Sequence, residues 1–173
     1  MELKKLNLGC GRDYRKGFVN IDICNELKAD VYHDLGKFPY PFKDDHFDEV
    51  LSLGTLELID ANFLKIMEEL HRICKPGAII KIRGPVFPNM CSAQDPLTKK
   101  FLTWNTFEYF KGEGGTDYYS KARFKTLKRE YIFSINKFHW VNPIINLAPA
   151  FYTRFLFNLF PANCIYYKLK VLK

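Results

Sequence analysis

Several features that mark common classes of protein are missing from this sequence. Its five cysteines are scattered, odd in number and form no CxxC pair. This pattern argues against a disulfide framework and against a zinc site, so no metal is expected and a reducing compartment is the default. The opening MELKKLNLGCG runs straight into a strand-like segment without the hydrophobic region of a signal peptide, which favours a cytoplasmic protein.

Long apolar runs and repeats are also missing. The most apolar stretch, Ile144–Phe160, is broken by Pro149 and carries a charge at Arg154. It is therefore too short and too interrupted to span a bilayer. No internal repeat or low-complexity tract is present in the sequence.

What is present is an ordinary globular composition with an uneven charge. The chain has 173 residues, 47% of them hydrophobic and 26% charged, which is typical of one soluble domain. The net charge is +7: residues 1–97 contain 13 basic and 15 acidic side chains, whereas residues 98–173 contain 13 basic and 4 acidic ones. A basic half favours an anionic partner, such as nucleic acid, a phosphorylated substrate or a lipid headgroup. A solvated lysine-rich surface explains it equally well.

The order of predicted elements is that of an α/β protein. One helix is predicted after Asp60, a plausible N-cap, and Lys75-Pro76-Gly77 ends it. Its apolar residues recur on one face at helical spacing: Phe63, Ile66, Met67, Leu70, Ile73 and Cys74. Strands are predicted over residues 3–8, 18–23, 29–33, 48–53, 78–82, 124–133 and 165–172. Strands that alternate with a helix imply a mainly parallel sheet with helices on its faces.

The remaining segments are less regular. Between Gly84 and Tyr119 the chain contains several prolines and the sequence GEGG (Gly112–Gly115), which predicts a turn. The aromatic segment Asn142–Phe160 is predicted to be helical in part.

The stretch LNLGCGRDYRKGFVNIDI, residues 6–23, has the layout of a nucleotide-cofactor site: a strand, a glycine turn, and a second strand that ends in Asp22. A dinucleotide site needs GxGxxG, a full helix and an acid about 20 residues further on. Here Tyr14 occupies the third glycine position, and Asp22 follows Gly11 too closely for a helix that binds pyrophosphate. A phosphate-loop lysine–serine pair is also absent. The pattern therefore favours a nucleoside cofactor without phosphates, S-adenosylmethionine.

These motifs resemble those of the class I S-adenosylmethionine-dependent methyltransferases of the methyltransferase domain 11 kind, in their small bacterial and archaeal form. LNLGCG is similar to the family's glycine motif, FVNIDI to its ribose-binding strand, HDLGKFPYPFKDDHFDEVLS to its adenine-side segment, and LHRICKPGAIIKI to its helix-to-fifth-strand signature. The resemblance implies a Rossmann-like fold with a mostly parallel central sheet, an antiparallel last strand and helices on both faces. It divides a single domain, residues 1–173, into a cofactor-binding half (1–85) and a substrate-side, sheet-closing half (86–173).

The resemblance also implies which residues hold the cofactor. The backbone of the glycine turn would face the methionine part and the ribose, Asp22 would hold the ribose hydroxyls, and Ile23 would pack on the adenine. Asp34 would accept a hydrogen bond from the adenine amino group, and Leu35 would form an apolar wall. The implied cofactor-binding residues are Leu8, Gly9, Cys10, Gly11, Asp22, Ile23, Asp34, Leu35, Leu53 and Gly54.

The acceptor side departs from the family pattern. The family's V-L-E-H reads Thr55-Leu56-Glu57-Leu58 here, and the later PVF and DPLTKK segments lack the histidines that relatives often carry. Methyl transfer depends on positioning the acceptor more than on a catalytic triad. His139 and Tyr118 are the candidates for a general base or an acceptor-pocket group, and the methyl acceptor is not identified.

Two other functions stay open at this point. One is a non-catalytic module that binds S-adenosylmethionine or S-adenosylhomocysteine. The other is a nucleic-acid-binding protein that uses the basic C-terminal half, including the lysines and arginines of residues 121–129. An exposed edge strand, on which lysines discourage pairing with other sheets, explains those cations at least as well.

Overall fold

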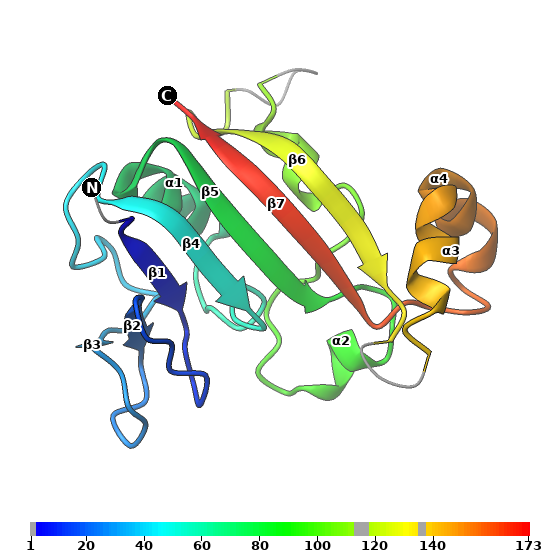
Figure 1. The fold of residues 1–173 in the computed structure, drawn as a ribbon, viewed down its shortest axis with the longest axis horizontal. Coiled ribbons are helices and arrows are strands. Elements are labelled where there is room, and N and C mark those ends of the chain that lie inside the picture. The colour runs from blue at the N-terminus through cyan, green and yellow to red at the C-terminus, as the bar shows by residue number, and fades with distance from the viewer. Residues whose placement is uncertain (1–2, 113–117, 135–137) are drawn as a thin grey trace.

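A seven-stranded sheet forms the centre of the protein (Figure 1). The computed structural model describes residues 3–112, 118–134 and 138–173, so most of the predicted GEGG turn lies outside the described residues. The strand order is β3-β2-β1-β4-β5-β7-β6. Strand β7 runs antiparallel to both of its neighbours, β5 and β6, and the other pairs are parallel. The predicted mostly parallel sheet with an antiparallel last strand is therefore confirmed.

The strands follow the predicted ones with changed bounds. They are β1 (Lys5–Leu8), β2 (Val19–Asp22), β3 (Val31–Tyr32), β4 (Phe47–Leu53), β5 (Cys74–Pro85), β6 (Arg123–Ile132) and β7 (Cys164–Leu172). The largest differences are β3, which shrinks to two residues at the edge of the sheet, and β5, which extends the predicted strand in both directions. The pairing of β5 with strands on both sides explains its length.

Helix α1 (Phe63–Ile73) packs its apolar face on the sheet as its spacing predicts, and Ile66, Met67 and Leu70 are fully buried. The predicted N-cap at Asp60 is wrong. The cap is Asn62, whose side-chain oxygen accepts hydrogen bonds from the Leu64 and Lys65 amides at 2.9 and 3.4 Å. Both residue types are good caps, so the sequence could not decide between them.

The other helical segments are short. They are α2 (Cys91–Gln94), the 3₁₀ helix η1 (Thr106–Phe110), α3 (Val141–Leu147), α4 (Pro149–Phe151) and the π-helical turn η2 (Tyr152–Leu156). The predicted partial helicity of the aromatic segment is thus confirmed. Phe107 of η1 packs on Tyr167 of β7 and on Phe63 of α1, so η1 and α1 share one face of the sheet.

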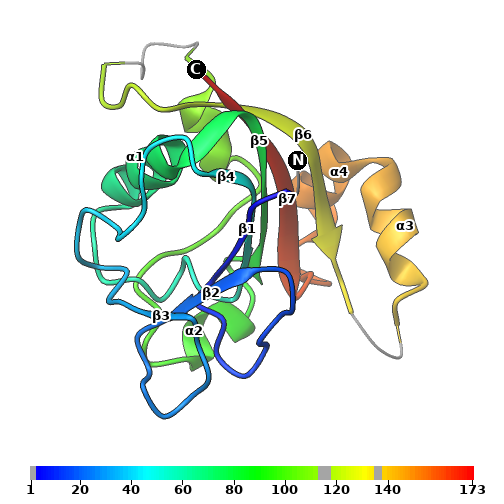
Figure 2. The same ribbon diagram turned by 60° about the vertical axis from the view of Figure 1, so that its left-hand side comes forward.

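The helices are not spread evenly over two faces. Helix α1 lies behind the sheet in Figure 1, whereas α3 and α4 lie beside β6, and Figure 2 shows the same arrangement from the side. Residues 9–18 connect β1 to β2 and residues 23–30 connect β2 to β3, and neither connection contains a helix. The face opposite α1, called the second face here, therefore carries half-buried and charged side chains in its central part. On β5 these are Ile79, Lys81 and Arg83.

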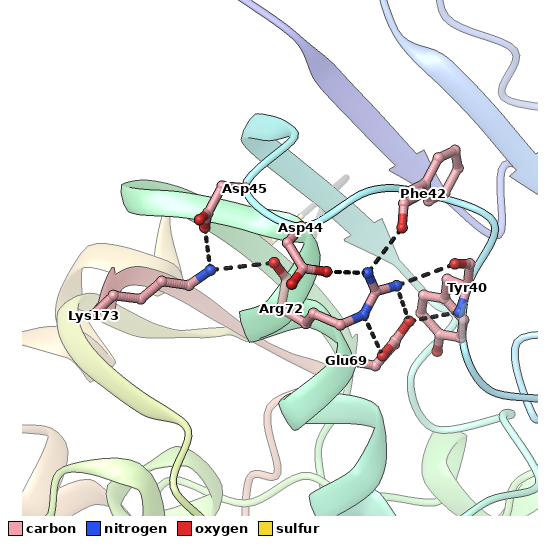
Figure 3. Close-up of polar contacts among 7 residues, drawn as sticks. All are labelled: Tyr40, Phe42, Asp44, Asp45, Glu69, Arg72 and Lys173. Carbon is pink, nitrogen blue, oxygen red and sulfur yellow. Dashed lines mark hydrogen bonds and ion pairs between the residues drawn. The ribbon is translucent and has the colours of Figure 1, made fainter.

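Arg72 of α1 ties the loop before β4 to the helix (Figure 3). Its guanidinium donates to the carbonyl oxygens of Tyr40 and Phe42 at 3.1 and 2.9 Å, and to the carboxylate of Asp44 at 2.6 Å. It also pairs with Glu69, whose Oε1 accepts the Tyr40 amide at 2.6 Å. Because this loop supplies part of the pocket described next, the network connects the helix to the site.

Candidate functional site

The carboxyl ends of β1, β2 and β4 surround a cavity of about 490 Å³. This is where open parallel sheets bind their ligands. The cavity brings together residues that are far apart in the sequence, and it is lined by Gly9, Gly11, Asp22, Ile23, Asp34, Leu35, Gly36, Gly54, Thr55, Leu58, Ile59 and Asp60. Seven of the ten residues predicted to hold the cofactor are in this lining.

The glycine turn after β1 requires glycine at its first position. Gly9 has a φ of +63°, and a Cβ there would lie 2.2 Å from Cγ2 of Thr55. Thr55 cannot easily move away, because its hydroxyl donates to the Leu8 carbonyl oxygen at 3.0 Å. Gly11 also has a positive φ, +51°, and a Cβ there would meet nothing within 4 Å. The turn is thus packed against β4 on one side and open to the cavity on the other.

Asp22 closes the turn at the end of β2. Its Oδ2 accepts the Gly11 amide at 2.7 Å, and its Oδ1 accepts the Cys24 amide at 2.9 Å. These two bonds hold the carboxylate in one orientation, and each oxygen keeps acceptor capacity for a ligand. Next to it, the large apolar side chain of Ile23 is 66% exposed in the cavity wall.

Asp34 and Leu35 form the opposite side of the cavity. Asp34 Oδ1 accepts the Gly36 amide at 2.9 Å, so the carboxylate is held by its own loop. Leu35 is buried, and its carbonyl oxygen accepts the hydroxyl of Tyr40 at 3.0 Å. Tyr40 is in turn held by Glu69 and Arg72, which extends the Arg72 network to the cavity wall.

The residues present fit an adenosyl group and not a dinucleotide. Carboxylates at Asp22 and Asp34 can accept hydroxyl and amino hydrogens, and Ile23 and Leu35 offer apolar surface to a base. In the described residues, the glycine turn leads into turns and extended chain and not into a helix whose N-terminus could hold a pyrophosphate.

Three predicted residues do not line the cavity. Leu8 is fully buried in the core, and Leu53 is half-buried at the end of β4. Cys10 is buried with its amide bonded to the Ile21 carbonyl oxygen at 3.0 Å. Burial, together with the nearby Asp22 carboxylate, raises the pKa of the Cys10 thiol, which keeps it protonated near neutral pH. Whether the backbone of these residues contacts the cofactor stays a prediction.

A wall of the cavity formed by residues 55–60 was not predicted from the sequence. Thr55, Leu58, Ile59 and Asp60 line the cavity between the end of β4 and the start of α1. The sequence contained a signal for this wall, because the segment that follows the fourth parallel strand begins at the same edge of the sheet as the glycine turn. Asp60, predicted as a helix cap, is instead part of this wall.

Glu57 was also missed, and it is the most unusual group near the cavity. Its side chain is 3% exposed, yet its Oε2 has no hydrogen-bond partner among the described residues. Both carboxylate oxygens lie 3.2 Å from the position of a Cβ on Gly84, and Oε1 lies 3.8 Å from that of a Cβ on Gly54. The carboxyl group therefore lies between the ends of β4 and β5. Burial raises its pKa.

The two candidate catalytic residues are not in the cavity lining. Tyr118 lines a separate hollow with Glu68 and His71, at the edge of the sheet where the parallel strands begin. The strand that follows Tyr118, β6, starts at the opposite edge of the sheet from the cavity, and a role of Tyr118 on the acceptor side stays a prediction. His139 is exposed just before α3, beyond β5 and β7.

The described residues also show two structural absences. No group of three or more histidine, cysteine, aspartate or glutamate side chains in them is arranged to hold a metal ion. None of the helices that the structure describes has the length and the apolar character needed to cross a membrane.

Comparison with known proteins finds similarity to methyltransferases. Residues 6–82 match the family model described as "Methyltransferase domain". No curated protein matches the chain. Among solved structures, the chain is similar to an S-adenosylmethionine-dependent methyltransferase from Archaeoglobus fulgidus, with a TM-score of 0.65 and 18% identity over 97% of this chain and 86% of that one.

Two further structures show the same likeness. A methyltransferase dependent on S-adenosylmethionine from Mesorhizobium loti has a TM-score of 0.63 and 14% identity, over 97% of this chain and 90% of that one. A complex of the Trm112 methyltransferase activator with a putative methyltransferase from Haloferax volcanii has a TM-score of 0.60 and 14% identity, over 98% of this chain and 82% of that one. At these identities the likeness establishes the fold. The chain therefore has the fold of these S-adenosylmethionine-dependent methyltransferases, and its residues 6–82 are similar to the methyltransferase domain.

Proposed function

We propose that the cavity at the ends of β1, β2 and β4 holds S-adenosylmethionine and that residues 86–173 carry the acceptor side. The observation that supports this most is the doubly held carboxylate of Asp22 next to the open glycine turn. Asp22 would hold the ribose hydroxyls, and Ile23 and Leu35 would enclose the adenine with Asp34 at its amino group. Gly9, Gly11 and Gly54 would leave room for the methionine part.

The cofactor supplies a methyl group on a sulfonium that is already a good leaving group, so the protein's task is to position the acceptor and exclude water. Thr55 holds the glycine turn in its open form through the Leu8 carbonyl. Next to the cavity, Gly84 and Glu57 are buried, whereas Gly54 is exposed. A preorganised site of this kind needs no catalytic triad.

On the acceptor side we propose that Glu57 contacts the polar group that receives the methyl. Its carboxyl is buried, is incompletely hydrogen-bonded and lies between Gly54 of the cavity and Gly84 of β5. A buried polar group without a partner is costly, and this cost is removed when a ligand supplies the partner. If the acceptor must lose a proton, a carboxylate whose pKa is raised by burial is a suitable base.

The test is calorimetric titration with S-adenosylmethionine and S-adenosylhomocysteine, with NAD as the control ligand. Saturable binding of both adenosyl compounds and none of NAD is expected. Asp22→Ala should weaken adenosyl binding at least about tenfold, because hydrogen bonds to a charged group are lost. The exposed carboxylate of Glu68 on α1, outside the cavity lining, gives the matched control Glu68→Ala. Equal affinities in the two variants would show that Asp22 does not hold the ribose.

A further inference from the structure

The segment after β6 exposes an unusual amount of apolar surface. Leu147 is 84% exposed and Leu159 is 70% exposed, and most large apolar side chains around them are at least half exposed. We call this set the aromatic flank; it consists of Phe138, Trp140, Ile144, Leu147, Phe151, Phe155, Leu156, Leu159 and Phe160. Soluble monomers rarely expose contiguous apolar patches of this kind unless the patch meets a partner.

The flank is held firmly against the sheet. The Asn146 side chain accepts the Tyr131 amide at 2.8 Å and donates to the Tyr131 carbonyl oxygen at 2.7 Å, which completes the free edge of β6. The Asn142 side chain accepts the Phe133 amide at 2.7 Å. Tyr152 and Phe157 are buried against Tyr131. The inner side of the segment is therefore hydrogen-bonded to β6 and packed against it. The segment lies in a fixed position beside β6 (Figures 1 and 2).

The exposed apolar side chains of the flank are arranged in a regular way. Ile144 and Leu147 are one helical turn apart on α3, so they share a face. The rings of Phe151 and Phe155 lie 5.0 Å apart, and the guanidinium of Arg154 lies 5.7 Å from the centre of the Phe155 ring. An apolar surface with aromatic rings and a basic group at its border is typical of segments that lie in a membrane interface.

The sequence that forms the flank and the last strand carries charge of one sign. No aspartate or glutamate follows Glu130 in the sequence, whereas residues 131–173 contain five lysines and arginines. A charge distribution of this kind repels cations and basic surfaces and attracts anionic ones. It continues onto the adjoining strands.

Strands β5, β7 and β6 carry lysines in register on the second face. Lys168 of β7 stands opposite Lys81 of β5 and Lys128 of β6, and Lys170 stands opposite Lys125. A bulge at Leu127 shifts the alternation of β6, which brings Lys125 and Lys128 to the same face. Like charges directly opposite each other are destabilising in a sheet. Such rows are stabilised when an anion binds them.

Carboxylates of the protein neutralise only part of the positive charge of these lysines. Lys81 pairs with Glu49 and Lys128 with Glu130, both at 2.7 Å. In the described part of the chain, Lys125, Lys168 and Lys170 have no carboxylate within 4.0 Å. These three lysines are available to an external anion on the second face of the sheet, whose edge strand β6 is bonded to the segment that carries the aromatic flank.

We propose that this protein docks on an anionic lipid surface, with the aromatic flank in the interface and the lysines of β6 and β7 against the headgroups. A lipid surface covers apolar and basic groups together. A nucleic acid would neutralise the lysines, but it would leave the apolar side chains of the aromatic flank exposed to water. A second copy of the chain would bring like charges together. The inference does not depend on the proposed cofactor roles or on Glu57.

The test is co-sedimentation of the full chain with vesicles of phosphatidylcholine alone or with about one third phosphatidylglycerol, a share large enough to give a negative surface potential. Binding to the anionic vesicles is expected, weakened by 1 M salt, together with a blue shift of Trp140 fluorescence in a Trp104→Phe background. Phe151→Ser/Leu159→Ser should weaken binding at least about tenfold through lost apolar burial. The control Leu3→Ser/Met90→Ser removes equally exposed apolar groups outside the flank and should change nothing.

The lysines are tested in the same assay. Lys125→Gln/Lys168→Gln should reduce binding to anionic vesicles, and Lys43→Gln/Lys65→Gln, which removes the same charge elsewhere, should have a smaller effect. Absence of vesicle binding by protein that still binds S-adenosylmethionine would overturn the proposal. It would also be overturned by tight, salt-sensitive binding of a single-stranded oligonucleotide without vesicle binding. Concentration-dependent dimerisation that is abolished by Phe151→Ser/Leu159→Ser, without vesicle binding, would overturn it as well.

Discussion

The two halves of this chain use their residues in different ways. Residues 3–85 place three carboxylates and four glycines around one cavity at the edge of a parallel sheet, and the carboxylates of Asp22 and Asp34 accept hydrogen bonds from backbone amides. Residues 86–173 close the sheet with an antiparallel strand, lack carboxylates after Glu130, and leave apolar and basic side chains exposed. The first half forms a cavity that we propose for a small ligand. The second half presents groups that a larger partner can cover.

The largest expected effect comes from breaking the first half at Gly9. Gly9→Ala places a Cβ 2.2 Å from Thr55 Cγ2 in a backbone with a φ of +63°. The strained backbone costs about 1–3 kcal/mol, and the clash with the held Thr55 adds to it. Denaturant unfolding should show this loss, and S-adenosylmethionine binding should be abolished.

Gly17→Ala is the matched control, because Gly17 has a φ of +78° but a Cβ there meets nothing within 4 Å. Gly17→Ala should lower the free energy of unfolding only through the strained backbone, and it should leave S-adenosylmethionine binding unchanged. Equal losses of stability in the two variants would mean that the Thr55 contact does not restrict Gly9.

The next largest effect comes from Arg72, which connects α1 to the loop behind the cavity (Figure 3). Arg72→Ala leaves the Glu69 carboxylate buried without its partner and frees the Tyr40 and Phe42 carbonyls. We expect a loss of about 3 kcal/mol in the free energy of unfolding. The double variant Arg72→Met/Glu69→Gln should be less damaging than Arg72→Ala. If it is more damaging, the buried charge of Glu69 is not the source of the loss.

A smaller effect is expected where the second half is fastened to β6. Asn146→Ala removes the two hydrogen bonds that complete the Tyr131 edge, with an expected cost of about 1–3 kcal/mol. Hydrogen exchange should then rise at the Tyr131 amide while the amides of β1 and β4 stay protected. Asn25→Ala, at an exposed asparagine in the first half, should stay within about 0.5 kcal/mol of the parent. A uniform rise of exchange across the sheet would contradict a local role for Asn146.

The smallest effect is at Glu57, where the two halves meet. Its pKa in the folded protein lies above its unfolded value because of burial, so the folded state binds the proton more tightly. The Glu57 carboxyl therefore contributes fully to the free energy of unfolding below its unfolded pKa. This contribution is lost as the pH rises from there through the folded pKa. Glu57→Gln should remove this loss and raise the free energy of unfolding at pH 8 by about 1 kcal/mol.

The same variant should lower methyl transfer without changing S-adenosylmethionine affinity, since Glu57 is outside the cavity lining. Urea unfolding of both proteins at pH 4 and pH 8 measures the stability difference. A difference that does not change with pH would show that the Glu57 carboxyl does not ionise in this range.

The sequence by itself determined the order of the elements, the apolar face of α1 and the chemistry of the cofactor edge. These features are local: helical spacing, a glycine turn after a strand, and acids where strands end are all readable within a few residues. Of the seven predicted residues that line the cavity, Gly9, Gly11 and Asp22 come from such a local pattern, and the other four were implied by the resemblance to the methyltransferase family. Their contacts with the cofactor stay predictions until the titration is done.

Only the tertiary structure decided which groups meet across the halves and which stay exposed. Glu57 became notable because Gly84 of β5 and the end of β4 enclose its carboxyl. Tyr118 lies in a hollow apart from the cavity because β6 starts at the other edge of the sheet. The lysine rows depend on strand register and on a bulge at Leu127, and the aromatic flank depends on which side of α3 meets β6. Register and packing arise from long-range contacts, which no short stretch of sequence encodes.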